Sequence, residues 1–346
     1  MYRKLVLLAA LLLLYSPAQS QSTDRFPFTN HGKTGYVDHT GKIIIKPRFD
    51  DGWRFNEGLA PVRIDDKWGY IDLTGRIVIK PQFFRVTAFS DGLAVVGVLF
   101  ESGPDEHDQV GNYGFIDRTG KIVIKPQFDV AFNFADGLAR VLTSDGKHAY
   151  IDRAGKIVLV WPDPSSEDFS NGLALFSTHG NMPDSRSGYI DQTGKIMIEA
   201  RYEAAGNFSE GLACVAEGGK AGFIDTKGQI AISLSFDSCK DFSEGLAAVE
   251  KDGKWGYLNR TGVVVIEPQF DEAEAFSDDL AVVRRHDKFG AVGKDGLMIL
   301  APQFTQMSAF SGGLAVVNLT DAFVVCGDFS KWAYLDKHGT YIWKSE

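Results

Sequence analysis

The sequence predicts an all-β protein built from tandem repeats of about 34 residues, and three observations support this class. A glycine in an aromatic segment such as KWGYID recurs along the chain, most often at intervals of 34 residues. A second segment, of the type FSEGLA, recurs in step with it. Runs of β-branched residues such as IVIK lie between the two, and these favour strands. A fixed period of this length is typical of a repeat architecture.

The two recurring segments define columns that run through the chain. The glycine column comprises Gly35, Gly69, Gly114, Ala149, Gly188, Gly222, Gly256, Gly290 and Ala333. The phenylalanine column comprises Phe55, Phe89, Phe134, Phe169, Phe208, Phe242, Phe276 and Phe310. Three longer intervals place insertions near residues 97–112, 177–187 and 318–331. We therefore expect about nine units in a single domain over residues 21–346.

Each unit is expected to contain three strands, of the types GLAVV, WGYID and RIVIKPQF. Asp72 and Gly75 illustrate the turn between the second and third strands, where aspartate accepts backbone hydrogen bonds and glycine adopts a left-handed conformation. Pro81 ends the third strand because proline has no N–H to donate. One unit cannot bury its own apolar face, so neighbouring units are expected to stack into a continuous core.

Two arrangements of the stacked units fit the sequence. The first is an open solenoid or superhelical array, and the alternative is a closed, eight-bladed propeller-like ring. Ring closure usually requires a blade that the two termini share. Here the first and last units each look nearly complete, which slightly favours the open array.

The first 20 residues have the layout of a signal peptide. Arg3 and Lys4 precede an apolar run, Leu5–Tyr15, which is too short to span a bilayer comfortably. We expect cleavage after Ser20 and export to the periplasm or the medium; the alternative is an uncleaved anchor. The mature chain would keep 34 basic against 45 acidic residues and no membrane span.

The repeated signature KWGYID, TGKIVIKPQFD and FSEGLA resembles the bacterial WG-repeat family, also called KWG repeats, from about Gly32 to Trp343. The resemblance implies a repeat of a kind that is often found in exported bacterial proteins, and it brings no catalytic residues with it. The chain departs from the signature at Ala149 and Ala333, which replace glycine, and at Ala200 and Leu234, which replace proline. A further unit, FGAVGKDG, lacks both the aromatic residue and the aspartate.

The insertions are candidate binding loops, because all three fall between the first and second strands of a unit. The first is acidic and is a candidate cation-binding loop, with a solvated loop as the alternative; its residues are Glu101, Asp105, Glu106, His107 and Asp108. The residue before the glycine varies between units, and four aromatic members are candidates for contacting a sugar or a protein partner: Trp68, Tyr113, Trp255 and Trp332. Packing against a neighbouring unit is the alternative for this variable column.

Cys214 and Cys239 lie in adjacent units and are candidates for a disulfide, which an exported protein can keep. The alternative for Cys239 is a small buried apolar residue, since its column otherwise holds mostly small apolar residues. Cys326 falls in the last insertion.

Composition and motifs together narrow the function. A net charge of −9 without a basic run argues against nucleic-acid binding. No spacing in the sequence predicts a catalytic, cofactor or metal site. The leading hypothesis is therefore a non-enzymatic exported scaffold that binds a protein partner. A carbohydrate or cell-wall binder that uses exposed tryptophans is the second hypothesis, and a hydrolase of unrecognised type is the third.

Overall fold

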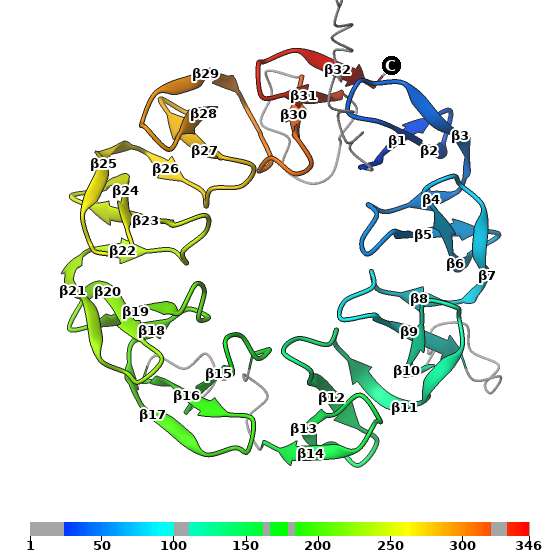
Figure 1. Cartoon of the computed structure of the whole chain (residues 1–346), viewed down its shortest axis with the longest axis horizontal. Coiled ribbons are helices and arrows are strands. Elements are labelled where there is room, and N and C mark those ends of the chain that lie inside the picture. The colour runs from blue at the N-terminus through cyan, green and yellow to red at the C-terminus, as the bar shows by residue number, and fades with distance from the viewer. Residues whose placement is uncertain (1–23, 100–110, 162–166, 179–183, 320–330, 346) are drawn as a thin grey trace, which may run out of the picture.

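The computed structural model describes residues 24–99, 111–161, 167–178, 184–319 and 331–345. These residues form strands and turns and contain no helix. They build eight antiparallel sheets, one of which has seven strands and joins two units, so the units number nine. Figure 1 shows the units arranged around a central opening. The prediction of an all-β repeat protein is confirmed.

Every unit has three main strands, and five units add a short one. The first strands are β1 (Phe26–Asn30), β5 (Leu59–Ile64), β9 (Leu93–Leu99), β12 (Ala139–Thr143), β15 (Leu173–Ser177), β19 (Leu212–Glu217), β23 (Leu246–Lys251), β27 (Leu280–Arg285) and β30 (Leu314–Asn318). The second strands are β2 (Lys33–Val37), β6 (Lys67–Asp72), β10 (Gly111–Asp117), β13 (His148–Ile151), β16 (Ser187–Asp191), β20 (Lys220–Asp225), β24 (Lys254–Asn259), β28 (Lys288–Gly293) and β31 (Trp332–Asp336). The third strands are β3 (Ile43–Phe49), β7 (Ile77–Phe83), β11 (Ile122–Ala131), β14 (Ile157–Val160), β17 (Ile196–Tyr202), β21 (Ile230–Phe236), β25 (Val264–Phe270), β29 (Met298–Phe304) and β32 (Tyr341–Lys344). The short strands are β4 (Asp51–Gly52), β8 (Arg85–Val86), β18 (Ala204–Ala205), β22 (Ser238–Cys239) and β26 (Glu272–Ala273).

The glycine column exists because the third strand bulges over it. In unit 2, Trp68 pairs with Phe83 and Tyr70 pairs with Ile79, so three residues of β7 lie opposite Gly69 alone. A Cβ added at Gly69 would lie 2.6 Å from the nitrogen of Pro81 and closer still to the carbonyl oxygen of Ile79. Only glycine leaves room for this bulge.

The two units with alanine in this column have no bulge at that position. Ala149 pairs with Val160 and Tyr150 with Leu159, in continuous register. Ala333 likewise pairs with Lys344, next to Tyr334 with Trp343. The third strands of both units are four residues long, whereas β7 has seven. The alanines therefore coincide with a shortened strand, and the fold of the unit is kept.

Neighbouring units are joined through the aromatic residue that follows the glycine column. In unit 2 the buried Tyr70 hydroxyl donates to the carbonyl oxygen of Thr87 at 2.8 Å. Its ring centroid lies 4.9 Å from that of Phe89 in unit 3. Tyr150, Tyr189 and Tyr257 make the corresponding hydrogen bonds at 2.7 Å. The phenylalanine column thus forms the core between units.

The same contact closes the ring between the last unit and the first. The Tyr334 hydroxyl donates to the carbonyl oxygen of Pro27 at 2.8 Å, and its ring lies 5.4 Å from Phe26. Phe28 packs on Trp343 at 5.3 Å. The expected open array is therefore not confirmed, and the alternative of a ring holds, with nine units rather than eight. No blade is shared, because units 1 and 9 form separate sheets; Tyr334 donates to a residue within β1, whereas the tyrosines of the other units donate to the linker before the next first strand.

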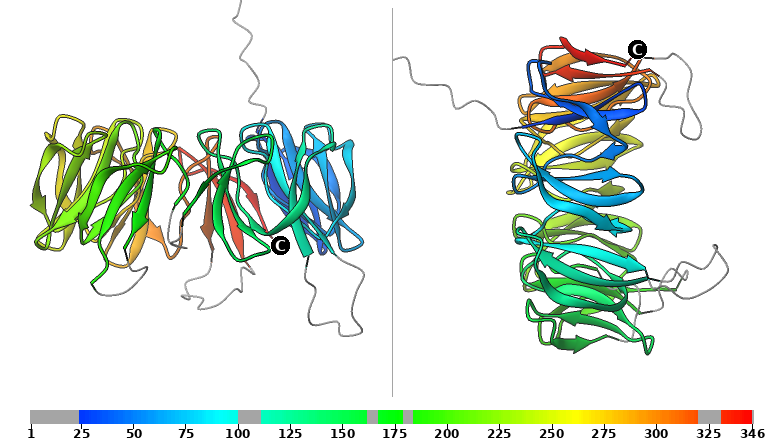
Figure 2. Two further views of the ribbon diagram at one scale, coloured as in Figure 1. Left: turned by 90° about the horizontal axis from the view of Figure 1, so that it is seen from below. Right: turned by 90° about the vertical axis from the view of Figure 1, so that its right-hand side faces the viewer.

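The ring is one unit thick and has two distinct faces (Figure 2). One face, here called the channel face, carries the FSEG-type turns before the first strands, as between Asn56 and Leu59. It also carries the Asp-Gly turns after the second strands, as between Asp72 and Arg76. On the opposite face, here called the hairpin face, the first strand turns into the second, as between Ile64 and Lys67. The third strands form the outer rim, where Ile77 is 41% exposed. The described residues contain no helix of the length and apolarity that crossing a bilayer requires.

Candidate binding face

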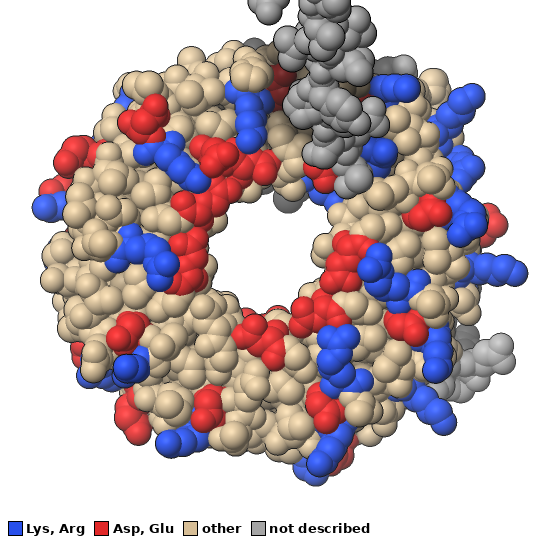
Figure 3. Space-filling model, in the orientation of Figure 1, with Lys and Arg blue, Asp and Glu red and all other residues tan. Residues whose placement is uncertain are grey.

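Acidic side chains surround the opening on the channel face (Figure 3). In six of the FSEG-type turns a carboxylate accepts a hydrogen bond from the backbone of the next turn. The N–H of Gly172 donates to Asp136 at 2.8 Å, and that of Gly313 donates to Asp278 at 2.7 Å. These carboxylates lock neighbouring turns together. Among the described residues, no group of three or more His, Cys, Asp or Glu side chains could hold a metal ion.

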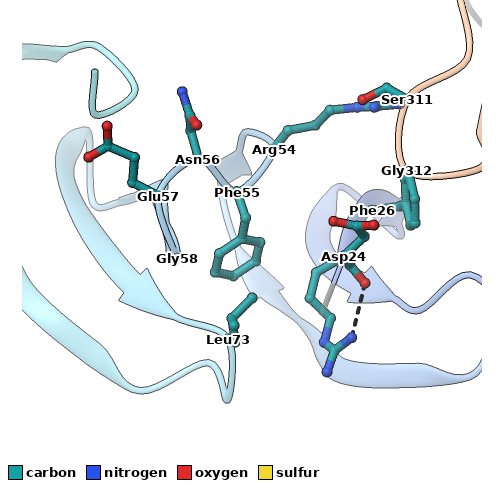
Figure 4. A pocket seen from close by; sticks show the side chains of 11 residues that line it. Asp24, Phe26, Arg54, Phe55, Asn56, Glu57, Gly58, Leu73, Ser311 and Gly312 are labelled. Carbon is teal, nitrogen blue, oxygen red and sulfur yellow. Dashed lines mark hydrogen bonds between the residues drawn. The ribbon is translucent and has the colours of Figure 1, made fainter. Parts of the chain in front are cut away.

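A pocket of about 310 Å³ lies on the channel face where units 1, 2 and 9 meet. Figure 4 shows Arg54 extending from unit 2 toward Ser311 of unit 9. Asp24 and Glu57 also line this pocket, so both signs of charge are present. The lining residue Phe26 packs on Tyr334, whose hydroxyl closes the ring and whose pKa is raised by burial to about 12. The pocket is thus part of the closing contact.

The variable column lies near the hairpin face, where the second strands begin. Its four predicted candidates are half-buried and fall in four separate units: Trp68, Tyr113, Trp255 and Trp332. Lys240 of the same unit lies 5.4 Å from the centroid of the Trp255 ring. The structure brings these side chains to one face and does not gather them into one cluster.

Units 2, 3 and 4 carry further aromatic residues beside this column. The ring of Trp53 lies 5.0 Å from that of Trp68, and Phe84 lies 6.1 Å from Tyr113. In unit 4, Phe132 occupies the position of Trp53, and the guanidinium of Arg140 lies 4.3 Å from its ring centroid. We call these five residues the aromatic arc: Trp53, Trp68, Phe84, Tyr113 and Phe132.

Sequence reasoning missed three members of the arc, because they lie in the linker that precedes each first strand. Trp53 and Phe132 are the most exposed of the arc, at 41% and 42%. Both stand two residues before the phenylalanine column, and this shared offset was a usable indication in the sequence. Phe84 stands five residues before that column, and this offset is not shared with Trp53 or Phe132, so the sequence offered no comparable indication for it.

The predicted cation-binding loop lies outside the described residues, with Glu101, Asp105, Glu106, His107 and Asp108. Its two anchors are described. Leu99 ends β9 and Gly111 begins β10, and the two residues are paired. The other two insertions also leave from ends of first strands, β15 and β30, on the hairpin face. All three insertions therefore start from one face of the ring.

A disulfide joins Cys214 of unit 6 to Cys239 of unit 7, with their Cα atoms 5.9 Å apart. Both residues line a pocket of about 320 Å³ that also includes Asp241. Burial raises the pKa of the Asp241 carboxyl. Cys326 lies outside the described residues.

The recurring aspartates act in turns. In unit 2, Asp72 Oδ1 accepts the Thr74 hydroxyl at 2.6 Å and the backbone N–H groups of Thr74 and Arg76 at 2.9 and 3.0 Å. These hydrogen bonds, led by the one from the Thr74 hydroxyl, lower the pKa of Asp72. Asn259 accepts the same three bonds in its own turn. The set of aspartates is thus structural.

Comparison with solved structures shows the fold. A crystal structure of a eukaryotic initiation factor has a TM-score of 0.62 at 11% identity and covers 93% of this chain and 95% of that one. BamB from Moraxella catarrhalis has a TM-score of 0.42 at 14% identity, over 84% of this chain and 97% of that one. The C-terminal WD40 domain of Sif2 has a TM-score of 0.40 at 12% identity, over 86% and 94%. No curated protein sequence matches the chain.

The family comparison follows the unit structure. The profile of the WG containing repeat matches residues 35–68, 68–98, 113–147, 188–220, 222–255, 255–289 and 289–321. The unmatched stretches include Ala149 and Ala333, the two units with a shortened third strand. Since the matches cover well over half of the sequence, the chain belongs to the WG containing repeat family.

Proposed function

We propose that this protein is an exported, non-catalytic scaffold that binds a protein partner across the hairpin face of units 2 to 4. The observation that carries the proposal is the aromatic arc, which places five aromatic rings in three consecutive units, two in the variable column and three in the linkers beside it. Trp and Tyr are enriched at the energetic centres of protein interfaces, together with Arg.

The arc has the rigidity that an interface centre needs. Trp53 is exposed through its side chain, while its backbone N–H donates to Pro61 at 3.0 Å and its carbonyl accepts the Tyr36 hydroxyl at 3.0 Å. Arg140, beside Phe132, is fixed by Asp168, with 2.6 Å between Nε and Oδ1. Ordering such a surface on binding costs little side-chain entropy.

The first insertion adds a second contact region to the same surface. Its anchor Gly111 borders the arc, because a Cβ added there, or at Gly97 two residues before Leu99, would meet the ring of Phe84. A partner seated on units 2 to 4 would therefore also meet residues 100–110.

Two features support export. The N-terminal layout of a cationic start and a short apolar run is that of a secretory signal. The bridge between Cys214 and Cys239 is of a kind that persists in oxidising compartments.

Pull-down from the envelope fraction of the source organism tests the proposed surface. The test variant carries Trp53→Ala and Phe132→Ala, which remove side chains and leave the backbone hydrogen bonds in place. The matched control carries Ile77→Ala and Ile122→Ala on the outer rim, where exposures are similar at 41% and 48%. We expect the test variant to lose the partner and the control to keep it. Equal recovery by both variants would contradict the proposal.

Removing residues 100–110 provides a second arm of the same experiment. We expect this variant to fold, because Leu99 and Gly111 are already paired and can be joined by a short turn. Its partner recovery should fall. Full recovery would exclude the first insertion from the interface.

A further inference from the structure

Trp332 lines two cavities on the hairpin face at the seam between the last and first units. One, of about 270 Å³, is bounded by Thr29, Asn30 and His31 of unit 1 and by Trp343 and Lys344 of unit 9. The other, of about 250 Å³, is bounded by Gln306, Ser308 and Asn318 within unit 9. Closure of the ring thus creates a site to which both ends of the described chain contribute.

The cavity within unit 9 exists because the linker residue there is small. In unit 2 the equivalent residue is Trp53, whose ring lies 5.0 Å from Trp68. In unit 7 it is Lys240, whose ammonium lies 5.4 Å from the Trp255 ring centroid. In unit 9 the residue is Ser308, and space remains beside Trp332.

Trp332 is held firmly in place. Its backbone N–H donates to Ser345 Oγ at 2.8 Å, and its carbonyl accepts the N–H of Ser345 at 2.9 Å. Its ring stands edge-on to Tyr334 at 5.1 Å and lies 4.7 Å from the ring of Trp343. The indole is therefore preorganised as a stacking platform.

The walls around this platform are polar. Thr29 and His31 line one side and Gln306 lines the other, while the hydroxyls of Ser308 and Ser345 are already hydrogen-bonded to Val316 and Trp332. The Oδ1 atom of Asn30, in the same wall, is buried and accepts no hydrogen bond from the described residues. Buried polar atoms in native proteins normally have partners, so this acceptor is suited to a donor from a ligand.

We propose that these two cavities, here called the seam pocket, bind a pyranose saccharide stacked on Trp332, with one ring in the cavity beside Ser308 and a second ring reaching the cavity lined by Asn30. A pyranose has an apolar C–H face that suits an indole and hydroxyl groups that suit a polar wall. The two cavities are each slightly smaller than a typical pocket for a drug-sized ligand, which fits one sugar ring apiece. The site lies apart from the aromatic arc and does not depend on the proposed protein partner.

Calorimetric titration of the full chain with cellotriose, triacetylchitotriose and maltotriose tests this proposal. We expect at least one of the three to bind. Ser308→Trp, which reproduces the filled arrangement of unit 2, should weaken that binding at least about tenfold. Trp332→Ala should do the same. Trp68→Ala, the matched control in unit 2, should leave the affinity unchanged.

Two results would overturn the proposal. One is the absence of heat and of saturation-transfer NMR signals with all three sugars at millimolar concentration. The other is binding that survives Ser308→Trp. If Trp332→Ala fails to fold, Ser308→Trp decides alone, since the Trp53 pairing shows that the fold accepts this arrangement. In the pull-down we expect Ser308→Trp to recover the protein partner as the unchanged protein does, which would show that this site and the aromatic arc act independently.

Discussion

Gly69 shows how a single residue type is fixed by the backbone of the neighbouring strand. The bulge in β7 presses the Pro81 nitrogen and the Ile79 carbonyl onto the space where a side chain would begin. Ala200 stands in the place of proline, yet its unit keeps both the bulge and Gly188. The bulge, and not the proline, therefore requires glycine.

Gly69→Ala should lower the free energy of unfolding by about 2–4 kcal/mol, because backbone atoms must move to admit the methyl group. Ala149→Gly is the matched control, at the same column in a unit without the bulge. It should cost about 1 kcal/mol or less, through added chain entropy. Denaturant unfolding of both variants measures the difference, and equal effects would show that the close approach is absent.

The turn aspartates make the free energy of unfolding depend on pH in the acid range. Hydrogen bonds from threonine hydroxyls lower the pKa values of Asp72, Asp117 and Asp191 in the folded state. A lowered folded pKa adds stability that is complete above the unfolded value of about 3.9 and is lost as pH falls toward the folded pKa.

We therefore expect the free energy of unfolding to fall as the pH drops below about 5. The triple variant Asp72→Asn, Asp117→Asn and Asp191→Asn should show a shallower decline, since Asn259 shows that an amide keeps the turn hydrogen bonds. Urea unfolding between neutral and acidic pH tests this. If the free energy of unfolding falls equally steeply with pH in both proteins, titratable groups other than these three aspartates cause the loss of stability in acid.

At the scale of elements, the sequence predicted the three main strands, their turns and the stacking of units, because each depends on local patterns. It did not predict the short strands such as β4 and β8. Those depend on pairing with a first strand, as Gly52 pairs with Val62, and two residues carry too little pattern to be recognised. The bulge opposite Gly69 was missed for the same reason.

The bridge from β19 to β22 joins two units across 25 residues of sequence. Closing a loop of this size restricts the unfolded chain and stabilises a fold by about 3 kcal/mol. Reduction, or Cys239→Ser, should therefore move the denaturant midpoint down by a matching amount. Cys326→Ser should leave it in place. An unchanged midpoint after reduction would show that the bridge adds no stability.

At the scale of the whole molecule, ring closure could not be predicted from the repeat pattern. The decision depends on the small rotation between successive units and on contacts between residues 307 positions apart, such as Tyr334 and Pro27. Each unit looks the same in sequence whether the array closes or stays open. The expectation of a shared blade was therefore no guide to this protein.

The candidate face was predicted in part. The variable column and the insertions were recognised as places where the copies differ, and the structure places the column and the insertion anchors on the hairpin face. The aromatic arc was not recognised, because Trp53, Phe84 and Phe132 become neighbours of the column only when the linker folds back along the first strand. Trp255 was one of the predicted binding residues, and in the structure the ammonium of Lys240 lies 5.4 Å from its ring centroid.

Site-specific photocrosslinking in the living source organism tests whether the hairpin face of units 2 to 4 binds a protein partner. Benzoylphenylalanine replaces Trp53 or Phe132 on the hairpin face, Ile77 on the outer rim, or Glu57 on the channel face. We expect the first two positions to crosslink to the same protein and the other two to give no crosslink. Crosslinks from Ile77 or Glu57, with Trp53 and Phe132 silent, would contradict it.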